Sequence, residues 1–191
     1  MLTWTFDEVV FTSINRLAGK WPVLDCLGIF FAEYLPYVLT TVLILWLIVD
    51  YRKRWQSLAI FYLTAIFSRF VVTEIIRYLL PRSRPFVDNA VNLLINHDAS
   101  NSFPSGHAAF YFALGAAIYL YNKKAGVVFL LAALLTSVAR VYVGVHWPTD
   151  IISGAIVGVL SAYAINFLKQ EFINETRLRS DELRQGKARR C

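Results

Sequence analysis

Long, uninterrupted apolar stretches constrain this chain more than any other feature of its sequence. These stretches cover residues 24–49, 58–80, 108–121, 127–143 and 151–168. Hydrophobic residues make up 57% of the 191 positions and charged residues only 17%. A soluble domain of this size leaves too much of its surface in water to hide so many apolar side chains. Stretches of this length instead indicate membrane-spanning helices, so we expect an all-α integral membrane helical bundle of five spans.

The N-terminal segment has a different pattern. Residues 3–20 place Phe6, Val10, Ile14 and Leu17 on one helical face, whereas Asp7 lies elsewhere on the helix. This spacing predicts an amphipathic helix at the membrane interface or docked on the protein surface. A sixth span results if this helix crosses the membrane.

The distribution of basic residues predicts the topology. The formal net charge is +6, but the basic residues form short clusters beside apolar stretches, which favours membrane anchoring over binding of nucleic acid. If the chain enters the first long span from outside, one side holds 12 of the 19 Lys and Arg residues, in 52–54, 123–124 and 169–191. We therefore predict a plasma-membrane domain over residues 1–168 and a basic cytoplasmic tail over residues 169–191.

The same topology gathers polar residues on the outer face. The loops at residues 82–104 and 144–149 then both face outward, and all three histidines, His97, His107 and His146, lie in these loops or at their ends. Three arginines, Arg77, Arg84 and Arg140, belong to the same face. Guanidinium groups match phosphate oxygens in a bidentate geometry, so a phosphate group is the natural ligand for this cluster.

A helix start provides a second anion-binding element. Ser105 and Gly106 immediately precede the stretch that begins at residue 108. Ser105 suits the N-cap position, and Gly106 lets the backbone approach a ligand closely. The exposed N–H groups and the dipole of a helix N-terminus also favour an anion. The pair can equally serve as an ordinary helix start.

Two histidines and a carboxylate indicate the chemistry. His146 precedes Asp150 by four residues, a spacing that suits a histidine oriented by a carboxylate. We expect His146 to attack phosphorus and form a phosphohistidine, and His107 to protonate the leaving oxygen as general acid. The arginines would stabilise charge on the equatorial phosphate oxygens. We expect His97 to be a bystander or a headgroup contact, and Arg69 to pair with Glu74 within the bundle; the alternative is that Glu74 contacts Arg77.

The joint spacing of these residues resembles that of a known family. The segments that carry the resemblance are Arg77-x6-Arg84-Pro85, Pro104-Ser105-Gly106-His107 and Arg140-x5-His146-x3-Asp150. They are similar to the three signature motifs of the type 2 phosphatidic acid phosphatase superfamily, over about residues 56–168. The resemblance implies the roles just given, with Arg77, Arg84, Arg140, Ser105 and Gly106 holding phosphate. It also implies that the reaction needs no metal or other cofactor.

Two positions depart from the family pattern. Arg77 stands where the family usually has Lys, which keeps the positive charge. Ala139 stands where the family usually has Ser, so one hydrogen bond to phosphate is missing or is supplied elsewhere.

The N-terminal pattern suggests a branch of that superfamily. Residues 14–19, 24–25 and 32–34 resemble those of small bacterial undecaprenyl-pyrophosphate phosphatases. We therefore expect an outward-facing phosphatase for undecaprenyl pyrophosphate in contact with membrane lipids. Phosphatidylglycerophosphate and phosphatidic acid are the competing substrates. Transfer of the phosphate to an acceptor other than water is an alternative reaction, and binding of anionic lipid is the non-enzymatic alternative.

Overall fold

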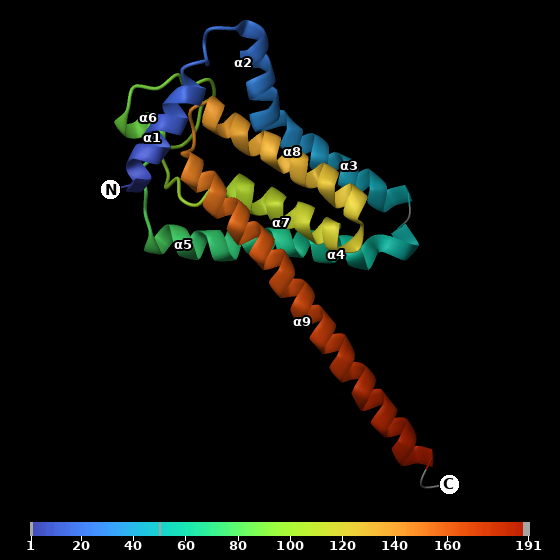
Figure 1. Ribbon diagram of the computed structural model, residues 1–191. Helices are drawn as coiled ribbons and strands as arrows, with labels where there is room; N and C mark the ends of the chain where they lie inside the picture. The colour runs from blue at the N-terminus through green and yellow to red at the C-terminus, as the bar shows by residue number, and fades with distance from the viewer. Residues whose placement is uncertain (1, 50, 189–191) are drawn as a thin grey trace.

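The computed structural model describes residues 2–49 and 51–188, and the side chains of residues 6–46 and 55–179. These residues form a bundle of helices without a strand among them, which confirms the all-α prediction (Figure 1). The helices in chain order are α1 (Leu2–Asn15), α2 (Pro22–Ile29), α3 (Leu35–Val49), α4 (Tyr51–Phe67), α5 (Thr73–Leu79), α6 (Pro85–Asp88), α7 (Gly106–Tyr121), α8 (Lys123–Tyr142) and α9 (Pro148–Ala188).

The predicted count of five or six spans is not confirmed. Within the described part of the chain, four helical stretches are long and apolar enough to cross a membrane: Pro22–Trp46, Trp55–Leu79, Lys123–Tyr142 and Pro148–Arg179. The stretch predicted as the third span forms α7, which has 16 residues. A helix needs about 20 apolar residues to cross the hydrocarbon core.

Helix α7 occupies the centre of the bundle. It lies between α8 on one side and α4 and α9 on the other (Figure 1), and Leu114 and Ile118 are fully buried. Glycines on α9 allow a close approach, because a Cβ at Gly158 would lie 2.5 Å from the Ala109 carbonyl oxygen and one at Gly154 would lie 2.5 Å from that of Ser105. This contact holds the start of α7 against the start of α9.

Two π-helical turns interrupt the long helices near one end of the bundle. Phe30–Tyr34 joins α2 to α3, and Ser68–Val72 joins α4 to α5. The carbonyl oxygen of Ala32 in the first turn accepts a hydrogen bond from Arg140. The second turn carries Arg69, which packs against Gly106. Turns of this kind often mark functional positions in helices.

Helix α1 docks on the bundle through a face that the apolar pattern did not predict. Its buried side chains are Asp7, Phe11 and Asn15, whereas Phe6 is 48% and Leu17 is 40% exposed. Of the apolar residues on the expected face, Phe6 and Leu17 are exposed and Ile14 packs on the core, so the predicted position of this helix at the membrane interface stays a prediction. Asp7 and Asn15 are buried because both accept or donate hydrogen bonds across the interface, which offsets the cost of removing polar groups from water.

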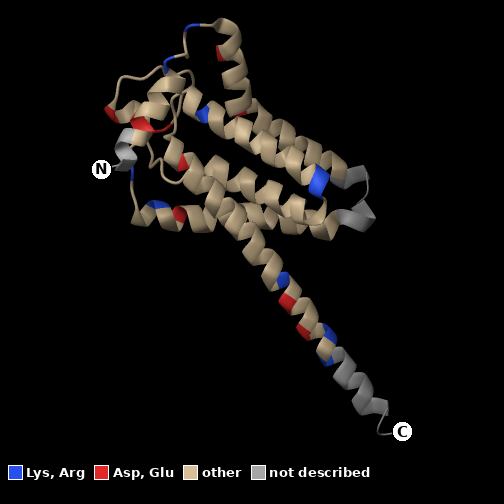
Figure 2. Ribbon diagram, viewed as in Figure 1, with Lys and Arg blue, Asp and Glu red and all other residues tan. Residues whose placement is uncertain are grey.

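The two ends of the bundle differ in character. The end of α3, the start of α4 and the α7–α8 connection lie at one end, and α9 continues beyond that end as a helix with several charged residues (Figures 1 and 2). The predicted tail is thus helical as far as Ala188. The basic side chains of residues 52–54 lie outside the described ones. The α5–α7 loop, α6, the α8–α9 connection and α1 gather at the opposite end (Figure 1).

The contact between α7 and α9 gives a prediction about stability. Alanine normally favours a helix over glycine by about 1 kcal/mol, yet Gly158→Ala should destabilise this protein by about 1–3 kcal/mol through overpacking. The Cβ would press on the backbone of α7, which cannot yield as a flexible side chain does. The measurement is the Tm in detergent, with Ile156→Ala on the exposed side of α9 as the control. A rise in Tm for Gly158→Ala would contradict the close contact.

Candidate active site

The three predicted motifs converge at the end of the bundle that carries α1 and α6 (Figure 1). Each motif is placed by a helix end: Arg77 lies in the last turn of α5, Gly106 begins α7, and Arg140 lies in the last turn of α8. Arg84 precedes α6, and Asp150 lies in the first turn of α9. The structure therefore brings these segments together at one end of the bundle.

Hydrogen bonds join the three motifs in pairs. Arg77 donates through Nη2 and Nε to the Pro104 carbonyl oxygen, at 3.2 and 3.3 Å. The backbone N–H of Ser105 donates to the carbonyl oxygen of Asp150 at 2.9 Å. Nη1 of Arg84 lies 3.3 Å from Nε2 of His146. Residues that are far apart in the sequence thus share one rigid network.

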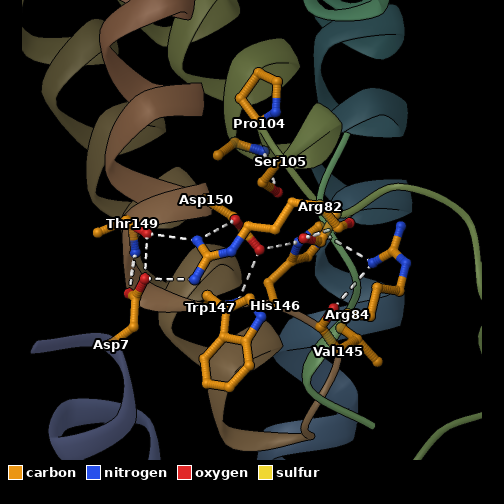
Figure 3. Close-up of polar contacts among 12 residues, drawn as sticks. Asp7, Arg82, Arg84, Pro104, Ser105, Val145, His146, Trp147, Thr149 and Asp150 are labelled. Carbon is orange, nitrogen blue, oxygen red and sulfur yellow. Dashed lines mark hydrogen bonds and ion pairs between the residues drawn. The ribbon is translucent and has the colours of Figure 1, made fainter. Parts of the chain in front are cut away.

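His146 is held between a carboxylate and a guanidinium group (Figure 3). Its Nδ1 lies 3.3 Å from Oδ2 of Asp150, and both side chains are buried. Because the Arg84 guanidinium has only donors, Nε2 of His146 must accept from it. The network therefore assigns the proton to Nδ1, where it faces Asp150, and leaves the lone pair on Nε2.

The surroundings of His146 favour its neutral form. Burial lowers the pKa of His146 well below its usual value, and the nearby charges of Arg140 and Arg84 lower it further. A neutral ring at physiological pH has the free lone pair that a nucleophile requires.

Arg140 is buried without a full set of partners. Its side chain is 2% exposed, and Nη1 donates to the Ala32 carbonyl oxygen at 3.3 Å. Nε and Nη2 have no hydrogen-bond partner among the described residues. A buried guanidinium in this state is expensive unless a ligand completes its hydrogen bonds. Arg140 lines a cavity of about 430 Å³, so an anion that enters there would supply the missing acceptors.

His107 lines the same cavity as Arg140. It also lines a second, shallower cavity of about 310 Å³, whose other walls include Arg69, Phe70 and Phe110. Its position in the first turn of α7 follows from the cap at Ser105, whose Oγ accepts from the Ala108 N–H at 3.5 Å. His107 thus lines both cavities, whereas His146 lines neither and is buried.

The two residues that open α7 have partners within the protein. The buried Ser105 both caps α7 and donates its N–H to Asp150, as given above. A Cβ added to Gly106 would lie 2.2 Å from Nε of Arg69. A larger residue here would displace the Arg69 side chain, and the predicted binding of phosphate by Ser105 and Gly106 stays a prediction.

The arginines differ in the hydrogen bonds and ion pairs that they form within the protein. Arg77 forms an ion pair with Glu74 at 3.0 Å, and Arg69 pairs with the same carboxylate. The expected pairing of Arg69 with Glu74 is therefore confirmed. Arg84 donates to the carbonyl oxygens of Val145 and Ser100, at 2.9 and 3.0 Å. Burial and the charge of Arg77 lower the pKa of Arg84 to about 10, so it is still a cation at neutral pH.

His97 belongs to the site, although we expected a bystander or a headgroup contact. Its ring centroid lies 6.4 Å from that of His146, and it lines the cavity with His107 and Arg140. Burial and the charges of Arg84 and Arg140 lower the pKa of His97 to about 4. No local motif marks this residue, and only the fold of the α5–α7 loop brings it to the site.

Comparisons with known proteins agree with this geometry. The sequence model described as the PAP2 superfamily matches residues 58–173. The chain is 34% identical to the bacitracin transport permease protein BcrC of Bacillus licheniformis, over 83% of this chain and 79% of that protein. It is 30% identical to the putative undecaprenyl-diphosphatase YbjG of Escherichia coli K12, over 84% of this chain and 81% of that protein.

A solved structure is similar as well. The crystal structure of Aquifex aeolicus LpxE superposes with a TM-score of 0.68 and 28% sequence identity, and the match covers 82% of this chain and 92% of that one. The matched residues include all three motifs and the helices that position them. The chain therefore belongs to the PAP2 superfamily and is a phosphatase, a hydrolase that acts on phosphate esters.

Proposed function

We propose that this protein is a membrane lipid phosphatase that hydrolyses undecaprenyl pyrophosphate through a phosphohistidine on His146. The observation that carries this proposal is the placement of His146 between Asp150 and Arg84, with its lone pair on Nε2. The incompletely bonded Arg140 beside the cavity supports a phosphate ligand. Four apolar helices support a membrane setting for the substrate.

The reaction proceeds in two displacements at phosphorus. Nε2 of His146 attacks the terminal phosphorus, a P–N bond forms, and the P–O bond to the leaving group breaks. His107 donates a proton to the leaving oxygen as general acid. Asp150 accepts the hydrogen bond from Nδ1 and stabilises the positive charge that develops on the ring. His107 then removes a proton from water, which attacks phosphorus, releases phosphate and restores His146.

The arginines supply the electrostatic part of catalysis. Phosphoryl transfer spreads negative charge over the three equatorial oxygens, so fixed cations around them lower the barrier. Arg140 and Arg84 are the buried cations nearest to His146. We assign them to the transferred phosphoryl group, together with Arg77 and the α7 N-terminus at Ser105 and Gly106. When a phosphate binds, Arg84 exchanges its contact with Nε2 for one with a phosphate oxygen.

The substrate assignment draws on the relatives and on the site. One relative is named a putative undecaprenyl-diphosphatase, and its match extends well beyond the motifs. The cavity beside Arg140 is large enough for more than a single phosphoryl group, which suits a diphosphate. Phosphatidylglycerophosphate and phosphatidic acid, which carry one terminal phosphate, are the substrates against which this assignment is tested.

The charge distribution supports an outward-facing site. Lys123 and Lys124 begin α8 at the end of the bundle opposite the active site, where α9 also leaves the bundle (Figure 2). Basic residues favour the cytoplasmic side. We therefore place the active site on the outer side of the plasma membrane, and the tail over residues 169–191 in the cytoplasm.

The first prediction of this mechanism concerns phosphate release. The detergent-purified protein should release phosphate from undecaprenyl pyrophosphate faster than from phosphatidic acid or phosphatidylglycerophosphate, with chelator present. His146→Ala should lose at least about 1000-fold in kcat, because no other group forms the P–N bond. Arg16→Gln, at an exposed position in the turn that follows α1, is the control. A fully active His146→Ala variant would refute the phosphohistidine mechanism, whereas no release by the folded wild type would favour simple binding of anionic lipid.

The second prediction concerns anion binding by Arg140. Inorganic phosphate should raise the Tm relative to sodium chloride of equal ionic strength, because a ligand that binds the folded state stabilises it. Each kcal/mol gained should shift the Tm by about 2–4 °C for a chain of this size. Arg140→Gln should abolish the shift, while Arg16→Gln keeps it. Equal shifts in wild type and Arg140→Gln would place the phosphate elsewhere.

The third prediction concerns pH. The pKa of His97 is about 4 in the folded protein, below the value of about 6.5 for an unperturbed histidine. Between these two values the unfolded chain binds a proton that the folded protein does not, so the free energy of unfolding should fall as the pH falls. His97→Asn should make the Tm depend less steeply on pH over this range. An unchanged pH dependence in this variant would contradict the buried, neutral state of His97.

A further inference from the structure

A chain of charged groups extends from His146 to the N-terminal helix, and no motif described above includes its outer members. The guanidinium of Arg82 lies between two carboxylates, those of Asp7 and Asp150 (Figure 3). Its Nη2 lies 2.7 Å from Oδ2 of Asp7, and its Nη1 lies 3.0 Å from Oδ1 of Asp150. We name this set, Asp7, Arg82 and Asp150, the carboxylate–guanidinium chain.

The carboxylate–guanidinium chain is largely buried, and burial constrains its geometry. Asp7 is 1% exposed and Asp150 is fully buried, and the Arg82 side chain is 14% exposed. Two buried carboxylates repel each other and lose their hydration unless a cation lies between them. The planar guanidinium satisfies both at once through separate nitrogens, which a lysine ammonium does less well. Arg82 also lies over the Trp147 ring, 5.2 Å from its centroid.

Thr149 forms further hydrogen bonds at the Asp7 end of the carboxylate–guanidinium chain. Its backbone N–H donates to Oδ1 of Asp7 at 2.8 Å, and its hydroxyl lies 2.5 Å from Oδ2 of the same residue. The hydroxyl also accepts from Nη1 of Arg82 at 2.7 Å. Asp7 therefore fixes the residue directly before Asp150, in addition to the arginine that contacts Asp150.

The position of Asp150 decides the position of His146. Oδ1 of Asp150 is held by Arg82, so Oδ2 is free to accept from the Trp147 N–H at 2.9 Å and from Nδ1 of His146 at 3.3 Å. If Oδ1 lost its partner, the carboxylate could rotate about its side-chain bonds and the hydrogen bond to Nδ1 would weaken. A shift of about 1 Å at a reacting group is enough to slow a reaction by about 100-fold.

We propose that Asp7 and Arg82 are positioning residues for the nucleophile, so that α1 is a working part of the active site. They act through Asp150 and do not line the cavity that holds His97, His107 and Arg140. Their loss should therefore reduce kcat and leave KM nearly unchanged. This inference rests on the proposed function, because it assigns a role within the same reaction.

The test measures kcat and KM for phosphate release from undecaprenyl pyrophosphate by the full chain in detergent. Asp7→Asn keeps the shape of the side chain and removes its charge; we expect kcat to fall about 10-fold or more and KM to change less than about twofold. Arg82→Lys, which keeps the charge, should lose less than Arg82→Gln. Phe11→Ala is the matched control, since Phe11 anchors α1 on Trp147, with ring centroids 5.1 Å apart, and has no charge.

A double-mutant cycle separates positioning from simple anchoring of α1. If Asp7 acts through Asp150, then Asp7→Asn should cost little further activity in an Asp150→Asn background. Tm values show which variants are folded, and Asp7→Asn alone decides the matter if the Arg82 variants do not fold. Full kcat in folded Asp7→Asn, an equal loss in Phe11→Ala, or additive losses with Asp150→Asn would each overturn the inference.

The wild-type protein in the same assay separates this inference from the proposed function. If wild type releases phosphate and Asp7→Asn keeps the wild-type kcat, only the positioning role fails. If wild type releases phosphate from none of the three lipids, the proposed function fails, and the positioning role fails with it.

Discussion

The rest of the site depends on the way Asp150 divides its hydrogen bonds among separate segments. Its backbone carbonyl accepts from the N–H of Ser105, Oδ1 accepts from Arg82, and Oδ2 lies beside His146. Because Asp150 is fully buried, each of these bonds forms in a medium where an unmade one is expensive. One residue thus connects the start of α7, the α5–α7 loop and His146.

The arginines differ in how many of their N–H groups have partners within the protein, and this difference supports the proposed position of the substrate. Arg77 is paired with Glu74, whereas Arg140 has only the Ala32 carbonyl oxygen and two nitrogens without partners among the described residues. A folded protein tolerates such a group when a ligand or a function compensates for its cost. The protein therefore keeps its carboxylates satisfied on the side of α1 and leaves binding capacity for an anion at the cavity.

Much of this arrangement could be predicted from the sequence, because apolar length and charge asymmetry are strong signals. They gave the helical class and brought Arg84, Ser105, Arg140 and His146 to one end. The face of α1 could not be predicted, since the apolar period favours Phe6 and Leu17, while the buried face contains Asp7 and Asn15. A buried polar residue is stabilised by partners far away in the sequence, and Asp7 meets Thr149 only after the whole bundle has formed.

The same reasoning explains why the contacts of His97 and Arg82 could not be predicted. Both lie in the α5–α7 loop, where no helical period orders the side chains, and their neighbours come from α1, α8 and α9. The motif residues lie at helix ends, which a sequence pattern can locate. Arg82 and His97 instead come from a loop whose path is set by tertiary hydrogen bonds. One of these is the bond from the Ser102 N–H to the Arg82 carbonyl oxygen at 2.8 Å. That bond holds the backbone of Arg82, so the side chain that reaches Asp150 starts from a position that the loop determines.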